Sequence, residues 1–136
     1  MIAIIQAPYY KKISALLLEG AIYELEKSNK EYQVIDVPGA LEIPSTISIL
    51  NESKKYDAFI ALGCVIRGQT THYDYVCQES AHGLSLLAIN HKIAIGNGIL
   101  TVENEEQAIA RADKDQKNKG GFAAKTCIRM IEIKNL

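Results

Sequence analysis

The sequence predicts an α/β fold in which a four-stranded parallel sheet is covered by helices on both faces. Short apolar runs alternate with segments of helical periodicity through all 136 residues. The apolar run at residues 58–66 shows no polar alternation, which is typical of a strand that is buried on both faces. Strands that alternate with helices favour right-handed crossovers and therefore a parallel sheet. We expect one domain over residues 1–136, built as an α/β/α sandwich.

Each predicted element has a local signal of its own. The helices show apolar residues three and four positions apart, which gives one buried face and one exposed face. Proline and glycine stop the first two strands, and Pro44 is tolerated because it falls in the first turn of a helix. Asn104, followed by Gln107, caps a later helix. The expected strands are residues 1–5, 32–37, 58–66 and 92–100, and the expected helices are residues 13–25, 42–50, 72–90, 104–112 and 121–134.

The turn between the third strand and the third helix is the centre of the predicted site. Residues 67–71 read Arg-Gly-Gln-Thr-Thr, and Thr71 with Asp74 predicts a capping box that starts the helix at about His72. A glycine turn before a helix N-terminus presents free backbone N–H groups and a positive dipole end. The turn lacks the lysine and the glycine spacing of a nucleotide P-loop. We expect it to bind an anion, most simply a phosphate, with an ordinary strand–helix turn as the alternative.

Composition argues against several classes of function. The chain is 48% apolar and 23% charged, which is normal for a globular protein. Its net charge is −1, and the basic residues do not form the strip that nucleic acid requires. The apolar runs are too short for a membrane span, and no signal-peptide pattern opens the chain. We expect a cytoplasmic protein with no nucleic-acid or membrane partner.

The cysteines and two of the histidines are predicted to be structural. Cys64, Cys77 and Cys127 are odd in number and lack metal-ligand spacing, so we expect buried thiols in a reducing cytosol. His82 and His91 have no ligand partner at useful spacing, so we expect surface or packing roles for them. The sequence predicts no metal site.

Ligands in parallel sheets bind beyond the carboxyl ends of the strands. Segments of the chain that should fall at those ends are therefore expected to converge on one rim. These segments are residues 7–10, 37–42, 64–72 and 97–99.

Residues on that rim suggest a heterocyclic and phosphorylated substrate. His72, in the first turn of a helix, is placed to act as a base near neutrality. Tyr9 offers a stacking face, and the stiff loop that contains Glu42 offers backbone amides and an acceptor. Arg111 suits a bound oxyanion in charge and fork geometry, with Lys119 as a second cation. The alternative for each residue is an ordinary surface or turn role.

Five motifs that run in order along the chain carry a family resemblance. They are Val-Pro-Gly-Ala-Leu-Glu-Ile-Pro at 37–44, Ile-Arg-Gly-Gln-Thr-Thr-His-Tyr-Asp-Tyr-Val at 66–76, Gly-Ile-Leu-Thr at 98–101, Glu-Gln-Ala at 106–108 and Asn-Lys-Gly at 118–120. Together the motifs resemble those of 6,7-dimethyl-8-ribityllumazine synthases, over essentially the full chain. The resemblance implies a flavodoxin-like fold. It also implies a transferase of riboflavin biosynthesis that condenses 5-amino-6-(D-ribitylamino)uracil with 3,4-dihydroxy-2-butanone 4-phosphate, without a metal or an organic cofactor.

The resemblance also implies roles for the matching residues. Tyr9 falls where the family stacks an aromatic ring on the pyrimidine, and His72 matches the proton-transfer histidine. Gln69, Thr70 and Arg111 match the phosphate site. The remaining positions that match substrate contacts are Ala40, Leu41, Glu42, Cys64, Val65 and Ile66.

Two further positions and the assembly state follow from the same resemblance. Asn97 matches a residue that a neighbouring subunit contributes, where the family commonly has phenylalanine. An amide cannot close an apolar lid, but it can hydrogen-bond a heterocycle. Lys119 matches a lysine close to the same pocket. Family members form homopentamers, some of which assemble into 60-subunit shells. Small residues at 77–85 would permit close helix approach in such an assembly, with ordinary packing on the sheet as the alternative.

Three other functions remain as alternatives at this point. A flavin or lumazine carrier of the same fold would not need His72 or the phosphate-binding residues. A shell-forming protein with a lapsed pocket would assemble without turnover. An FMN-dependent electron carrier is disfavoured because the phosphate turn follows the third strand instead of the first.

Overall fold

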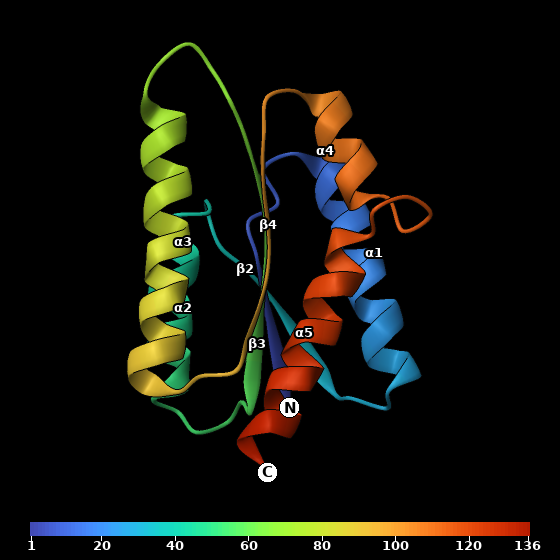
Figure 1. The fold of residues 1–136 in the computed structure, drawn as a ribbon, viewed down its shortest axis with the longest axis vertical. Helices are drawn as coiled ribbons and strands as arrows, with labels where there is room; N and C mark the ends of the chain where they lie inside the picture. The colour runs from blue at the N-terminus through green and yellow to red at the C-terminus, as the bar shows by residue number, and fades with distance from the viewer.

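The computed structural model describes residues 1–136 and confirms the predicted α/β fold (Figure 1). Four parallel strands form one sheet in the order β2-β1-β3-β4. The strands are β1 (Ile2–Gln6), β2 (Tyr32–Asp36), β3 (Ala58–Ile66) and β4 (Ile95–Val102). The helices are α1 (Lys11–Lys27), α2 (Glu42–Asn51), α3 (His72–His91), α4 (Glu105–Ala112) and α5 (Lys119–Lys134).

The helices form two layers, one on each face of the sheet. Helices α2 and α3 lie on one side, and α1, α4 and α5 lie on the other (Figure 1). Successive β1 residues point to opposite faces, so Ile4 joins the core under α1 and α5 while Ile5 joins the core under α2 and α3. Every β1 residue is buried, which explains why this strand is a continuous apolar run.

Close backbone packing fixes α5 against its neighbours. A Cβ atom at Gly96 of β4 would overlap the carbonyl oxygen of Ala123 in α5. A Cβ atom at Gly120 would overlap the carbonyl oxygen of Leu17 in α1. The two glycines are therefore required by contact distance, because α5 lies too close to the sheet and to α1 for any side chain there.

Most predicted boundaries agree with the structure, and the fourth strand is the main exception. Helix α3 ends at Lys92, which adopts the left-handed conformation with φ 54°. Residues 92–94 are therefore used for the connection, and β4 begins at Ile95 instead of Lys92. The strand then continues to Val102, which places residues 97–99 in its interior.

Of the two predicted helix caps, one is wrong and one is confirmed. Thr71 makes no side-chain capping bond, because its backbone is already helical. Helix α5 begins at Lys119, two residues before its predicted start at residue 121, and the Asn118 side chain caps it by accepting the Gly121 N–H at 3.2 Å. Asn104 caps α4 as predicted by accepting the Gln107 N–H at 2.9 Å.

The cysteine prediction holds for one residue of three. Cys127 is buried in the core, whereas Cys64 and Cys77 keep partial exposure. All three thiols are free. None of the helices combines the length and the apolar character needed to cross a membrane.

We expect Gly96→Ala to destabilise the protein by about 1–3 kcal/mol or more, because the added methyl group must push α5 away from β4. Gly68→Ala is the matched control. It adds the same methyl group at a glycine with no neighbouring atom within 4 Å and no positive φ. Urea unfolding of both variants measures the effect, and equal stability of the two would contradict the packing argument.

Candidate active site

A cavity of about 300 Å³ lies at the carboxyl ends of β1 and β3. These strands flank the point where the strand order reverses, which is where open parallel sheets bind ligands. The walls of the cavity are mainly apolar. The lining residues are Ala7, Tyr9, Tyr10, Pro38, Gly39, Ala40, Cys64, Val65, Ile66, His72 and Val76. Three of the four segments predicted to meet at the rim therefore do so.

The segment after β1 presents an aromatic ring to this cavity. The Ala7 N–H donates to the carbonyl of Leu62 at 3.0 Å, which extends the pairing of β1 with β3 by one bond. The Tyr9 N–H then donates to the Ala7 carbonyl at 3.0 Å, closing a three-residue turn around Pro8. The turn leaves Tyr9 76% exposed, edge-on to Tyr10 with ring centroids 4.9 Å apart. The Tyr9 ring is thus free to stack on a planar ligand.

The loop before α2 forms a second wall. Gly39 and Ala40 line the cavity, and their carbonyls accept the N–H groups of Glu42 and Ile43 at 3.1 and 3.2 Å. These bonds turn the loop directly into α2. Leu41 and Glu42 are exposed outside the lining, although the Glu42 carboxylate lies beside Gly39.

The end of β3 forms the third wall and offers free backbone groups. The register of β3 with β1 ends at Leu62, whereas its register with β4 continues to Ile66. Residues 64–66 therefore have a strand neighbour on one side only. The alternate N–H and C=O groups that face the β1 side are available to the amide edge of a ligand.

Burial changes the chemistry of Cys64 in this wall. Desolvation raises the pKa of its thiol from 9.0 to about 11. The side chain is thus neutral at physiological pH, and it acts as a packing residue and not as a nucleophile.

Arg67 anchors the loop that follows β3. Its Nε atom donates to Glu103 at 2.6 Å, and its Nη1 atom lies 3.5 Å from Asp74 of α3. The guanidinium also lies over the Tyr73 ring, 4.3 Å from the ring centroid. The hydrogen bond that Arg67 donates to the Glu103 carboxylate is the main cause that raises the Arg67 pKa. Arg67 thereby links the ends of β3 and β4 to the first turn of α3.

The loop anchored by Arg67 brings His72 to the cavity, but the other predicted site residues of the loop lie outside the cavity. His72 lines the cavity and is exposed. Gln69 and Thr70 are exposed and do not line it. The Thr70 hydroxyl accepts the His72 N–H at 3.2 Å and so occupies one of the first N–H groups of α3.

The structure does not place Asn97 at the rim, which corrects the prediction for residues 97–99. Asn97 is exposed in the interior of the edge strand β4, where its Oδ1 atom accepts the Ile99 N–H at 2.9 Å. It lies three register positions before Leu100, the partner of Cys64. This is a separation of about 10 Å along the strand.

Arg111 and Lys119 also lie outside the cavity within one chain. Arg111 is on α4, in the helical layer opposite α2 and α3, and donates to the Gln107 carbonyl at 3.1 Å. Lys119 begins α5, with its ammonium 5.7 Å from the centroid of the Phe122 ring. The predicted residues thus fall into three sets. Leu41, Glu42, Gln69 and Thr70 are exposed and do not line the cavity. The cavity group is Tyr9, Ala40, Cys64, Val65, Ile66 and His72, and the distal group is Asn97, Arg111 and Lys119.

Sequence reasoning missed several residues of the site. Ala7, Tyr10, Pro38, Gly39 and Val76 line the cavity without having been predicted as contacts. Their places in the sequence could have indicated them, because each is one or two residues from a predicted contact or one helical turn from it. The Glu103 partner of Arg67 is 36 residues away and carries no local signal.

The chain is similar to proteins of one family along almost its whole length. The family model described as 6,7-dimethyl-8-ribityllumazine synthase matches residues 1–135. A relative of that name from Bartonella tribocorum is 52% identical, covering 98% of this chain and 89% of the relative. Relatives of the same name from Zymomonas mobilis subsp. mobilis and Agrobacterium fabrum are each 50% identical, and both alignments cover 96% of this chain, with 94% and 92% of the relatives covered.

We expect the Cys64 thiol to react with iodoacetamide at pH 8 about a hundredfold more slowly than a thiol of ordinary pKa, because its thiolate fraction is lower by the same factor. A Cys77→Ser/Cys127→Ala background leaves Cys64 as the reacting group. The rate should rise with pH and reach its midpoint near pH 11. The same protein in urea is the control, and a folded-state midpoint at or below pH 9 would contradict the burial argument.

Proposed function

The chain belongs to the 6,7-dimethyl-8-ribityllumazine synthase family, and on this basis we propose that the cavity group forms one half of its active site. The protein is a transferase of riboflavin biosynthesis. It condenses 5-amino-6-(D-ribitylamino)uracil with 3,4-dihydroxy-2-butanone 4-phosphate to give the lumazine, phosphate and water. The observation that carries the site assignment is the meeting of an exposed ring, a free strand edge and a histidine in one cavity.

The pyrimidine occupies the cavity between Tyr9 and the end of β3. Tyr9 stacks on the ring, since its face is exposed and its position is fixed by the turn at Pro8. The free backbone groups of residues 64–66 hydrogen-bond the amide edge of the uracil. Ala40, Leu41 and Glu42 contact the ring edge and the ribityl chain at the side of the cavity.

The phosphate of the second substrate binds at the loop before α3. The backbone N–H groups of Gln69 and Thr70 lie on an exposed loop that leads into a helix N-terminus, which favours an anion. Arg67 holds both ends of the loop and so fixes the direction of these groups. Arg111 supplies the charge-assisted hydrogen bonds, with Lys119 close by.

The reaction needs little chemical assistance from the protein, because the reacting amine and ketone belong to the substrates themselves. Imine formation, elimination of phosphate and ring closure with loss of water complete the reaction. Holding the two substrates together supplies most of the acceleration. His72 moves protons at the mouth of the cavity, and the phosphate site assists departure of the leaving group.

A complete site needs two subunits in this proposal. The cavity group and the distal group do not meet within one chain, and Asn97 lies on an exposed edge strand. The distal group of one copy therefore faces the cavity group of the next, in a homo-oligomer. The family resemblance favours a pentamer, with the 60-subunit shell as a further stage of assembly, and a cytoplasmic location.

Some of the small residues on α3 pack within the subunit, and others are exposed. A Cβ atom at Gly83 would lie 2.8 Å from the Pro44 side chain, and Ser80 is buried, so both serve packing within the subunit. Ala81 and Ser85 are exposed beside the large apolar side chains of Leu86 and Ile89. The outer face of α3 is the surface that we assign to subunit contact.

We expect His72→Ala to slow lumazine formation by about 10²–10⁴-fold, because proton transfer is lost while substrate positioning survives. Product absorbance and phosphate release from the two substrates measure the rate. His91→Ala is the control, since His91 is exposed at the other end of α3 and does not line this cavity. An unchanged rate in His72→Ala would remove His72 from the mechanism. Substrate binding without turnover in the unaltered protein would identify a carrier or an inactive shell instead.

Mixing two inactive variants tests the shared site. His72→Ala and Arg111→Ala subunits, unfolded together and refolded in equal amounts, should recover about a quarter of the unaltered activity, because random assembly gives that share of interfaces with both residues intact. Each variant refolded alone is the control. If recovery is absent although mixed oligomers form, His72 and Arg111 act within one subunit.

A further inference from the structure

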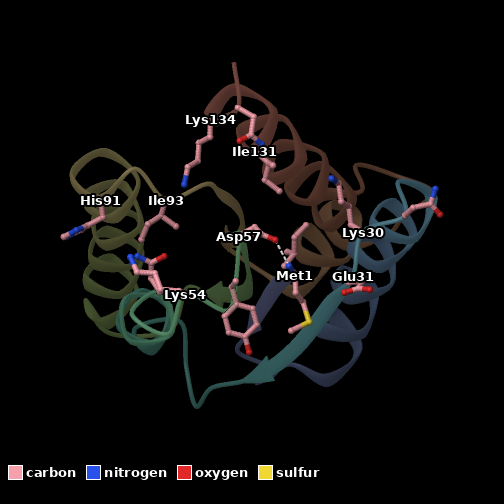
Figure 2. A pocket seen from close by; sticks show the side chains of 14 residues that line it. Met1, Lys30, Glu31, Lys54, Asp57, His91, Ile93, Ile131 and Lys134 are labelled. Carbon is pink, nitrogen blue, oxygen red and sulfur yellow. Dashed lines mark hydrogen bonds and ion pairs between the residues drawn. The ribbon is translucent and has the colours of Figure 1, made fainter.

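A second and larger cavity lies at the opposite end of the sheet, where the strands begin. Its volume is about 660 Å³, within the usual range for small-molecule sites. It is surrounded by the starts of β1 and β3 and by the ends of α1, α2, α3 and α5 (Figure 2). The lining residues are Met1, Ile2, Asn29, Lys30, Glu31, Asn51, Lys54, Tyr56, Asp57, His91, Ile93, Ile131, Lys134 and Asn135.

Uncompensated lysines dominate the charge of this cavity. Lys30 and Lys54 follow the ends of α1 and α2, Lys134 ends α5, and none of their ammonium groups has a carboxylate within 4.0 Å. Asp57 is already paired with the Met1 amino group. Glu31 is then the one carboxylate of the lining without a cationic partner. The side chains therefore make the wall positive.

Helix dipoles limit the kind of anion that this positive wall can bind. The carboxyl ends of α1, α2, α3 and α5 point here, and each carries roughly half a negative charge that fades beyond the last turn. These ends offset part of the lysine charge. A single negative charge gains little in such a field, whereas a ligand whose charges reach two or three ammonium groups gains from each contact.

Apolar and amide groups complete the lining. Ile2, Ile93 and Ile131 add apolar atoms to the lining; Ile131 is partly exposed, whereas Ile2 and Ile93 are almost fully buried. Figure 2 shows Lys134 extending from α5 toward Ile93. The side-chain amides of Asn29, Asn51 and Asn135 supply neutral hydrogen-bonding groups. His91 points away from the cavity in the same view.

We propose that this cavity, which we call the floor site, binds a small organic phosphate that carries at least two negative charges. The lysines hold the phosphate oxygens, and the isoleucines contact the carbon skeleton. The floor site lies at the other end of the strands from the active site, so its occupancy does not require the proposed catalytic residues.

Pyrophosphate titration followed by isoleucine-methyl NMR of the assembled protein tests the floor site. The methyl signals of Ile93 and Ile131 report on the floor site, and those of Ile66 report separately on the active site. We expect saturable shifts at Ile93 and Ile131 with pyrophosphate and none with chloride at the same ionic strength. In Lys54→Gln/Lys134→Gln the apparent Kd at these signals should rise about tenfold or more, while any response at Ile66 persists.

A matched double variant controls for net charge. Lys12→Gln/Lys117→Gln removes the same charge from exposed lysines that do not line the floor site, and its Ile93 and Ile131 titration should match the unaltered protein. Absence of saturable shifts at Ile93 and Ile131 would overturn the proposal. So would equal weakening in both double variants, because it would show general charge attraction. A shift at Ile66 alone would assign pyrophosphate to the active site and leave no floor site.

Discussion

The active site depends on one mismatch of length between neighbouring strands. β3 continues for four residues beyond its last register partner in β1, while β4 accompanies it to the end. Backbone groups of the overhang are therefore free on the side where the Tyr9 turn and the loop at Gly39 approach. If β1 were as long as β3, the two strands would pair along their whole length and the cavity would be absent. The apolar character of residues 58–66 keeps this strand in the sheet, because residues 58–63 are buried, and the overhanging residues 64–66 extend it in a partly buried position.

Arg67 connects that overhang to the rest of the rim. Its ion pairs are exposed to solvent, so they add little to overall stability. Their value is geometric, since one guanidinium contacts the segment after β4 and the first turn of α3 at once. The close packing of α5 on β4 at Gly96 holds the β4 side of this connection in place. The position of the loop before α3 thus depends on packing in a helical layer that does not line the cavity of its own subunit.

The sequence was sufficient to predict those parts of the structure that are controlled by local interactions. Apolar periodicity predicted the sheet, and β3 was placed at its observed limits because both of its ends carry clear signals. Asn97 was misplaced because the strand was expected to end at residue 100, whereas it runs to Val102. Gly96 is required within the strand by contact with α5, which no local pattern reveals. Thr71 failed as a cap because its backbone is already helical, so the Asp74 N–H donates to the Thr71 carbonyl, and Arg67 contacts the Asp74 carboxylate. The sequence likewise could not predict the division into a cavity group and a distal group, because this division depends on the distances between segments in the folded chain.

The same parallel topology makes the two ends of the sheet chemically different. At the carboxyl rim the N-terminus of α3 presents backbone N–H groups, so an anion can be held there with few charged side chains. At the amino end four helices terminate, and their carbonyls oppose an anion. Positive charge at that end must therefore come from side chains, which is what Lys30, Lys54 and Lys134 provide. The lysines also stabilise the helix ends that they follow, so their presence alone would not indicate a ligand. Their arrangement around one cavity whose lining includes apolar residues distinguishes the floor site from ordinary helix termination.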